Sequence, residues 1–171
     1  GESLTYSWDI GMGTNFTSLF AYYLASPSNW FVALFPQKYT IEIMNAFIIL
    51  KIAGSSLSLT YYLTKHNNNK HVIAAIFGMF YGMSGFIAAY SWNIMWLDCV
   101  ILIPLIMLGL ERLVNENRCI FYCITLGLCI FTNYYIAIMV CLSVVIYYVV
   151  LMIAYNGIKS PMQYVKKFIN F

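Results

Sequence analysis

The sequence predicts an all-α integral membrane protein with about five transmembrane helices and short interfacial helices in an outer loop. Hydrophobic residues make up 62% of the 171 residues and charged residues only 9%, which is too little charge to cover a water-soluble domain. Long apolar runs recur along the chain, and basic residues collect in the links between alternate runs. The lipid bilayer is therefore the expected surrounding.

Charge and cysteine usage exclude two classes of function. The nine Lys and Arg residues are scattered and form no basic face with interleaved aromatics, so we expect no nucleic-acid partner. The five cysteines lie in or beside apolar runs without the paired spacing of a zinc site. Cys119 and Cys123, one helical turn apart, could form a soft ligand pair, but two small buried residues are favoured. We assign no metal and no disulfide.

Residues 1–40 are predicted to form an extracytoplasmic loop with interfacial helices. Ser26 and Pro27 are typical of a helix start, with serine as the N-cap and proline in the first turn. Pro36 closes the short apolar run that begins at Trp30. Such a run cannot cross a core of about 30 Å, and the many Trp and Tyr residues favour the interface.

Residues 41–158 are predicted to form the transmembrane region. We place its spans at about 41–63, 72–90, 94–110, 119–131 and 134–155. Lys51 is the only charge inside the first span, and Gly78 and Gly82 form a pair that allows close helix packing in the second. Pro104 lies within the third span, and a charged turn is expected at 111–118.

The basic residues predict the orientation. Strict alternation places on one side Lys65, Lys70, Arg112, Arg118, Lys159, Lys166 and Lys167. By the positive-inside rule this side is cytoplasmic, and it includes a basic tail at 159–171. Residues 1–40, 91–97 and 132–135 then share the extracytoplasmic side.

The chain is expected to be part of a longer protein. It starts at Gly1 without an initiator Met or a signal peptide, and it stops just after a basic segment. Its partners would then include the remaining transmembrane helices of the same full-length protein.

Asp98 is the leading candidate for function. A carboxylate one turn inside a membrane helix is costly unless cations, donors or water meet it, and such residues mark functional sites. The alternative is an acid at the interface that reaches water or a helix N-terminus. A polar and aromatic lining favours function, and we expect substrate contacts from Trp92, Asn93, Trp96, Asn133, Tyr134 and Tyr135.

Two further residues are candidates. Lys51 lies roughly 15 Å below the outer surface at about 1.5 Å per residue, so it could pair with Asp98, bond to backbone carbonyls or bind an anionic head group. Asp9 lies beside a flexible turn and could act as a base or metal ligand, although an exposed loop acid is usually only solvated. Both histidines lie on the face opposite the acids, which makes hydrolytic nucleophile chemistry improbable.

Several separated motifs resemble the YfhO family of bacterial membrane proteins. They are YSWDIGMGTNF, YYLASPSNWFVALFP, YGMSGF, SWNIMWLD followed by ILIPLIMLGLERL, and TNYYIAIM. They occur in order between about Tyr6 and Tyr148. The resemblance implies a protein of the bacterial cytoplasmic membrane with part of a GT-C-like multi-pass fold, in which enzymes transfer a sugar from a polyprenyl-phosphate carrier. It also implies a catalytic acid in the first outer loop, which the family pattern would place before Gly1.

The expected function is therefore that of a membrane glycosyltransferase that uses a polyprenyl-phosphate-sugar donor and acts on a cell-envelope polymer such as teichoic acid. Asp98 and Asp9 are the candidate bases, Lys51 the contact for the lipid phosphate, and the aromatic residues the stacking surface for the sugar. A divalent metal is left open as a cofactor. The alternative is a non-enzymatic transporter or a lipid-linked sugar flippase, with Lys51 and Asp98 on a translocation path.

Overall fold

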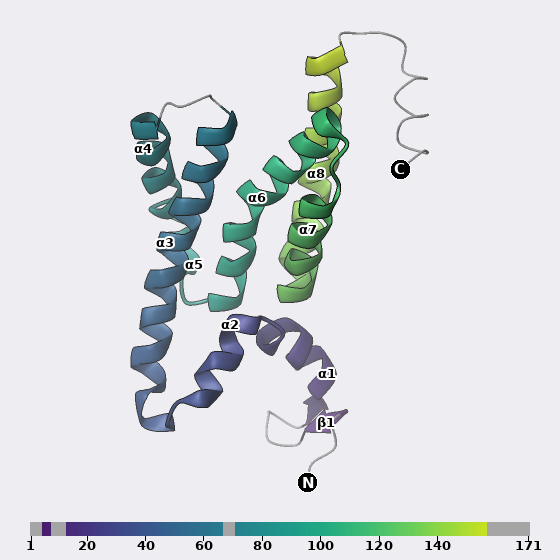
Figure 1. The fold of residues 1–171 in the computed structure, drawn as a ribbon. Coiled ribbons are helices and arrows are strands. Elements are labelled where there is room, and N and C mark those ends of the chain that lie inside the picture. The colour runs from purple at the N-terminus through teal and green to yellow at the C-terminus, as the bar shows by residue number, and fades with distance from the viewer. Residues whose placement is uncertain (1–4, 8–12, 67–70, 157–171) are drawn as a thin grey trace.

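The computed structural model describes residues 5–7, 13–66 and 71–156, and these form a helical bundle with a folded segment across one end (Figure 1). The helices of the bundle are α3 (Thr40–His66), α4 (His71–Gly82), α5 (Gly85–Tyr90), α6 (Ile94–Glu116), α7 (Ile120–Thr132) and α8 (Tyr134–Asn156). The sequence therefore belongs to the all-α membrane class that its composition predicts.

The segment before α3 consists of short elements, as predicted. A two-residue antiparallel pair, β1 (Tyr6–Ser7) and β2 (Thr14–Asn15), precedes α1 (Phe16–Leu19) and a π-helical turn at Phe20–Leu24. The helix α2 (Pro27–Trp30) and 3-10 turns at Phe31–Leu34 and Gln37–Tyr39 follow. Ser26 is the N-cap residue of α2, with proline in the first turn, but its hydroxyl caps no backbone N–H.

The number of spans differs from the expected five. Among the described residues, four segments are long and apolar enough to cross a membrane, namely Gln37–His66, His71–Tyr90, Ile94–Glu116 and Tyr134–Ala154. The segment expected at 119–131 is α7, which has 13 residues and a length of about 20 Å, short of a core of about 30 Å. Residues 117–119, which link α6 to α7, run along the bundle and add to the distance that α7 spans (Figure 1).

Two further boundaries differ from the prediction. The span expected at 72–90 is interrupted after Gly82, and a new helix starts at Gly85 with Ser84 as its N-cap residue. The charged turn expected at 111–118 is helical as far as Glu116, and Asn117 ends α6 in the left-handed conformation with φ of 55°. Asparagine tolerates this conformation better than most residues, which explains the end of the helix there.

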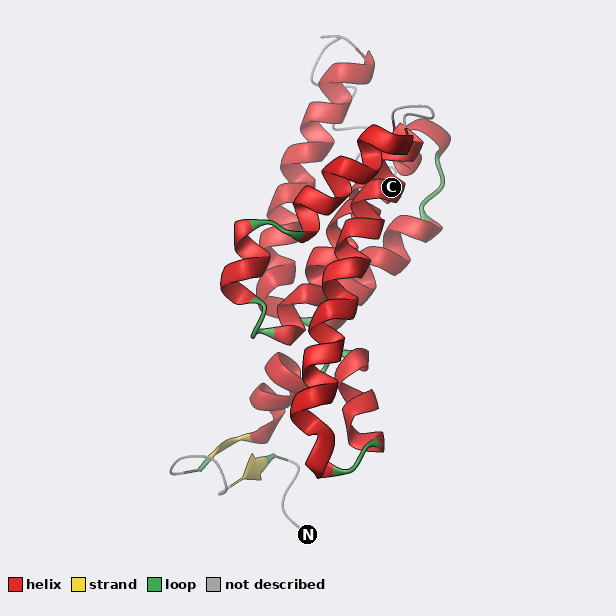
Figure 2. Ribbon diagram, turned by 90° about the vertical axis from the view of Figure 1, so that its left-hand side faces the viewer, coloured by secondary structure: helices red, strands yellow, loops and turns green. Residues whose placement is uncertain are grey.

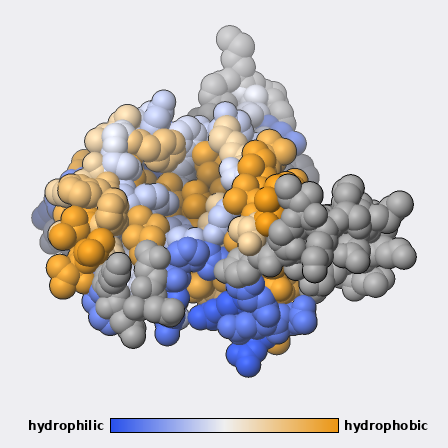
Figure 3. Space-filling model, turned by 90° about the horizontal axis from the view of Figure 1, so that it is seen from above, coloured by the Kyte–Doolittle hydropathy of each residue, from blue (hydrophilic) through white to orange (hydrophobic). Residues whose placement is uncertain are grey.

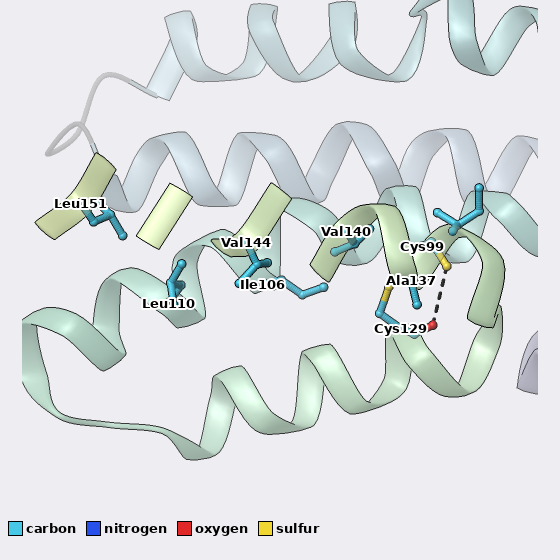
Figure 4. Packing of buried hydrophobic residues seen from close by; sticks show 9 residues of the cluster. Cys99, Ile106, Leu110, Cys129, Ala137, Val140, Val144 and Leu151 are labelled. Atoms are coloured by element: carbon cyan, nitrogen blue, oxygen red, sulfur yellow. Dashed lines mark hydrogen bonds between the residues drawn. The ribbon is translucent and has the colours of Figure 1, made fainter. Parts of the chain in front are cut away.

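The helix α6 lies at the centre of the bundle, with α3 on one side and α7 and α8 on the other (Figure 1). Figure 2 shows the same bundle from the side, with the two short strands at its N-terminal end. A larger apolar cluster joins α6 to α7 and α8 through residues such as Cys99, Ile106, Cys129 and Val140 (Figure 4). A smaller cluster of Ile87, Leu97 and Val100 joins α5 to α6. The helices α3, α7 and α8 therefore pack on α6, and α4 packs on α3.

The predicted Gly78 and Gly82 pair lies where α4 meets α3. A Cβ at Gly78 would stand 2.6 Å from the backbone oxygen of Ser56 and closer still to the Thr60 hydroxyl. A Cβ at Gly82 would collide with the Ser56 hydroxyl and stand 3.0 Å from the Ile52 oxygen. Only glycine allows this approach, so the small-residue pair sets the distance between the two helices.

Pro104 interrupts the hydrogen bonds of α6, and a residue from another helix compensates. Proline has no N–H, so the carbonyl four residues earlier, that of Val100, loses its helical donor. The hydroxyl of Tyr81 in α4 donates to this carbonyl at 2.8 Å. Unpaired backbone groups are costly inside a membrane, and Tyr81 supplies the hydrogen bond that the proline cannot donate.

We expect Tyr81→Phe to lower the free energy of unfolding by about 1–3 kcal/mol, because it leaves the Val100 carbonyl buried and unpaired. Unfolding of the reconstituted protein by denaturant measures this change. The double variant Tyr81→Phe with Pro104→Ala restores a helical N–H and should recover much of the loss. A loss in Tyr81→Phe that the double variant does not reduce would contradict this account.

Large apolar side chains cover the flanks of the described bundle, including Leu57, Phe80 and Ile146. Seen from the end at which α3 finishes and α4 begins, hydrophobic surface lies around the flanks, and hydrophilic residues gather among them (Figure 3). This distribution suits a protein whose flanks meet lipid and whose ends meet water. The chain is a multi-pass membrane protein.

Candidate functional site

The predicted site residues that the structure describes gather at one end of the bundle, where α6 begins and α7 ends. We call this the Asp98 end. The segment 13–40 lies across it (Figure 1). The opposite end carries Lys65, in the last turn of α3, and Arg118, just after α6. The sequence-based grouping of 91–97, 132–135 and the first loop on one side thus agrees with their positions in the fold.

Lys51 and Asp98 form an ion pair between α3 and α6. The ammonium nitrogen lies 2.9 Å from Oδ2 of Asp98 and donates a second hydrogen bond to the Ile94 oxygen at 3.0 Å. The lysine is only 5% exposed and the aspartate side chain 14%. Two of the contacts expected for Lys51, the pairing with Asp98 and the bond to a backbone carbonyl, are present in this structure. The lysine also fixes the first turn of α6 against α3.

Two serines of the N-terminal segment complete the surroundings of the Asp98 carboxylate. Ser26 and Ser28 both donate to Oδ2, the latter at 3.2 Å, and their hydroxyl oxygens are 2.7 Å apart. Ser26 is fully buried. This contact explains why the Ser26 hydroxyl does not cap α2, since it faces a carboxylate on another element. The carboxylate therefore anchors the segment 13–40 to the bundle.

The two oxygens of Asp98 have different surroundings. All three side-chain donors reach Oδ2, and no donor among the described residues reaches Oδ1. The side chain retains some exposure. A carboxylate held through one oxygen can accept a hydrogen bond from a bound hydroxyl through the other. The contacts to Oδ2 thus hold the carboxylate in place, and Oδ1 can accept a hydrogen bond from a bound molecule.

Asn133 anchors the same segment at a second point. Its side-chain N–H donates to the Tyr22 oxygen at 3.2 Å, and its Oδ1 accepts from the backbone N–H of Ile136 at 3.0 Å. The residue is fully buried. One side chain therefore caps the start of α8 and holds the π-helical turn of the segment in place.

An aromatic group lies at the same end. The Trp96 ring is 5.5 Å from the Tyr90 ring and stacks on the Tyr135 ring at 6.2 Å with an angle of 26°. The Tyr22 ring stands 6.2 Å from that of Tyr134 and 6.4 Å from that of Tyr135. The aromatic group thus joins α5, α6, α8 and the N-terminal segment.

The indole nitrogen of Trp96 is buried and has no hydrogen-bond partner among the described residues. Buried donors are normally paired, so an orphan N–H calls for an explanation such as an acceptor that a bound molecule supplies. This unpaired N–H belongs to Trp96, which lies two positions before Asp98 in α6.

The other predicted residues are less closely joined to this group. Trp92 is 72% exposed, and its indole N–H donates locally to the Ala89 oxygen at 3.2 Å. Asn93 is buried and is the N-cap residue of α6, and its side chain makes no capping hydrogen bond. Asp9 lies outside the described residues, so its role stays a prediction. No group of three potential metal ligands occurs within the described ranges.

Sequence reasoning missed three participants, namely Ser26, Ser28 and Tyr22. The serines flank Pro27, where the sequence predicts only a helix start. Polar residues spaced around a proline in an otherwise aromatic segment are a weak signal for a buried contact. Nothing in the sequence indicates that Tyr22 offers its carbonyl to Asn133, 111 positions later.

Comparison with protein families matches residues 1–171 to the family described as bacterial membrane protein YfhO. No curated protein and no solved structure matches the chain.

Proposed function

The chain belongs to the YfhO family of bacterial membrane proteins, and from this premise we propose that it is part of a membrane glycosyltransferase. The reaction transfers a sugar from a polyprenyl-phosphate carrier to a cell-envelope polymer such as teichoic acid. It takes place at the Asp98 end, on the outer face of the cytoplasmic membrane. Multi-pass membrane organisation is consistent with a lipid-linked donor.

The observation that carries the proposal is that two groups at the start of α6, the Asp98 carboxylate and the Trp96 indole, each keep an atom without a hydrogen-bond partner among the described residues. Asp98 leaves Oδ1 without a donor among the described residues, and Trp96 leaves its indole N–H without an acceptor among them. A sugar offers hydroxyl groups that both donate and accept, and aromatic rings such as Tyr135 suit its apolar face. Both groups are carried by the first turns of α6.

The residues would divide the work as follows. Asp98 accepts a hydroxyl hydrogen and, as general base, would take the proton that an attacking hydroxyl loses. Lys51 holds this carboxylate in place through Oδ2, and the lysine ammonium group becomes available to the departing phosphate only if the ion pair opens. Asn133 and the serines act as positioning residues, because they hold the segment that covers the site.

The class of function is tested in cells and with the purified protein. Deletion of the gene should lower the sugar content of the envelope polymer, and the reconstituted protein with polyprenyl-phosphate sugar and polymer should restore transfer. A protein that produces no transfer but moves the lipid-linked sugar across the bilayer would contradict the proposal and favour a flippase.

We expect Trp96→Phe to separate function from stability. The change keeps an aromatic ring but removes the unpaired N–H, so the free energy of unfolding should stay the same or rise by up to about 1–3 kcal/mol. If a substrate oxygen accepts from this N–H, kcat/KM should fall by about tenfold or more. Transfer assays and unfolding on the same preparation measure both quantities. Unchanged kcat/KM would remove Trp96 from the site.

A further inference from the structure

The candidate site is nearly closed to a bound molecule in the arrangement that the structure shows. The indole nitrogen of Trp96 is buried, and the Asp98 side chain is only 14% exposed. If both groups bind a sugar as proposed, oxygen atoms of the sugar must come within about 3 Å of them. Part of the protein must therefore move before a sugar can bind there.

Residues 13–35, which we call the cover, lie across the Asp98 end (Figure 1). In the part of the chain that the structure describes, neither apolar cluster of the bundle includes a residue of the cover. Its two serines donate to Asp98 instead, and Asn133 donates to the Tyr22 oxygen. Rings of Tyr22 and Trp30 add aromatic contacts. A segment held in this way separates at a lower cost in free energy than an element of the core.

The bundle residues that hold the cover also have partners of their own within the bundle. Asp98 is paired with Lys51, and this lysine donates to the Ile94 oxygen as well. Asn133 accepts from the backbone N–H of Ile136. These contacts do not involve the cover, so they persist when it moves away. Opening therefore makes the carboxylate accessible and leaves its ion pair intact.

A short extended joint connects the cover to the rest of the chain. Phe35 and Pro36 have ψ angles of 152° and 141° and lie between two 3-10 turns. The backbone N–H of Phe35 donates to the Val32 oxygen, and that of Tyr39 donates to the Pro36 oxygen. One bond lies before the joint and the other after it. Rotation of the backbone at these two residues can thus turn the cover and leave both 3-10 turns formed.

We propose that the cover is a lid, which opens about Phe35 and Pro36 to admit the substrates and closes when Ser26 and Ser28 bind Asp98 again. The structure shows the closed form. This inference rests on the proposed function, since the opening gives a lipid-linked sugar access to the carboxylate. The two serines act as the latch, so their removal shifts the equilibrium toward the open form.

A crosslink between the cover and the bundle tests the proposal. Trp30 of the cover and Phe131 of α7 are 50% and 51% exposed, and their rings are 6.3 Å apart. A short, reducible bis-thiosulfonate reagent is used to join Trp30→Cys to Phe131→Cys in the reconstituted protein. The parent protein has serine in place of Cys119, Cys123 and Cys141. We expect the crosslink to stop sugar transfer and a reductant to restore it.

The matched control joins two positions that both belong to the cover. The Trp30 indole donates to the Leu24 oxygen at 2.7 Å, so Leu24→Cys with Trp30→Cys places the same reagent near the same position. This crosslink does not tie the cover to the bundle and should leave transfer unchanged. Transfer that continues at the same rate after complete crosslinking of position 30 to position 131 would overturn the proposal.

A distance measurement tests the lid without relying on sugar transfer. Spin labels are attached at Leu24→Cys in the cover and Ile124→Cys in α7, both of which are exposed. Ser26→Ala with Ser28→Ala removes the latch and should increase the share of longer distances. Ser18→Ala is the control, because its hydroxyl bonds within the cover, and it should leave the distances unchanged.

The two readouts separate failure of the lid from failure of the proposed function. If no protein transfers sugar but loss of the latch lengthens the distances, the proposed function is wrong and the lid stands. If the distances are the same with and without the latch serines, the lid is wrong, whether or not sugar is transferred.

Discussion

Lys51→Met is expected to lower the free energy of unfolding by about 3–5 kcal/mol, because it leaves Asp98 buried without its cation. The change also removes the bond from Lys51 to the Ile94 oxygen, which fixes the start of α6. Denaturant unfolding in bicelles or mixed micelles measures the loss.

The double variant Lys51→Met with Asp98→Asn is the matched control for the ion pair. It removes both charges, and the amide oxygen that replaces the carboxylate still accepts from the two serines, so this variant should regain a large part of the stability lost in Lys51→Met. A double variant at least as unstable as the sum of the single changes would show that the two charges do not stabilise each other. Full transfer activity in a folded Lys51→Met protein would exclude Lys51 from phosphate binding.

Gly78→Ala is expected to separate α4 from α3 and to cost about 1–3 kcal/mol or more, because the new methyl group meets backbone as well as the Thr60 hydroxyl. The backbone of α3 cannot move away from the methyl group by changing rotamer, as a flexible side chain can. The helices must move apart, and the Tyr81 contact to the Val100 carbonyl should weaken with them.

Gly127→Ala in α7 is the control, since a Cβ there meets nothing within 4 Å. Alanine favours helix more than glycine does, so this change should raise stability by up to about 1 kcal/mol. Unfolding of both variants under identical conditions measures the difference. Equal effects at the two positions would mean that close packing at Gly78 does not hold the helices together.

Much of the fold follows from local sequence. The start of α6 at Ile94, the break before Tyr134 and the helix start at Pro27 are predicted within a residue, because each depends on residues that are neighbours in the chain. The end of α6 is not. Glu111 and Arg112 are expected to mark a loop, but Glu111 is partnered by Tyr62 and Tyr147 from other spans, and local charge gives no sign of those partners.

The sequence indicates which residues belong to the candidate site better than it indicates which contacts they make. A carboxylate and a lysine inside apolar runs indicate function or pairing by their cost alone, and the structure pairs them. The roles of Ser26 and Asn133 depend on how residues 13–40 fold back across the bundle. The break at Met83 and Ser84 has a usable signal in Gly82 and Gly85 on either side, but glycines in an apolar run are equally typical of close helix packing.

The most direct test of the central claim uses a cysteine introduced at Trp92, which is exposed at the Asp98 end. The parent protein has serine in place of the exposed Cys119 and Cys123 and of the partly exposed Cys141, and it keeps the buried Cys99 and Cys129. A membrane-impermeant maleimide is added to intact right-side-out vesicles, and both labelling and sugar transfer are measured. We predict that the reagent labels Trp92→Cys from outside and stops transfer, while it leaves the parent without that cysteine active. Labelling that requires permeabilised vesicles, or transfer that continues after complete labelling, would contradict a sugar-transfer site at the Asp98 end on the outer face.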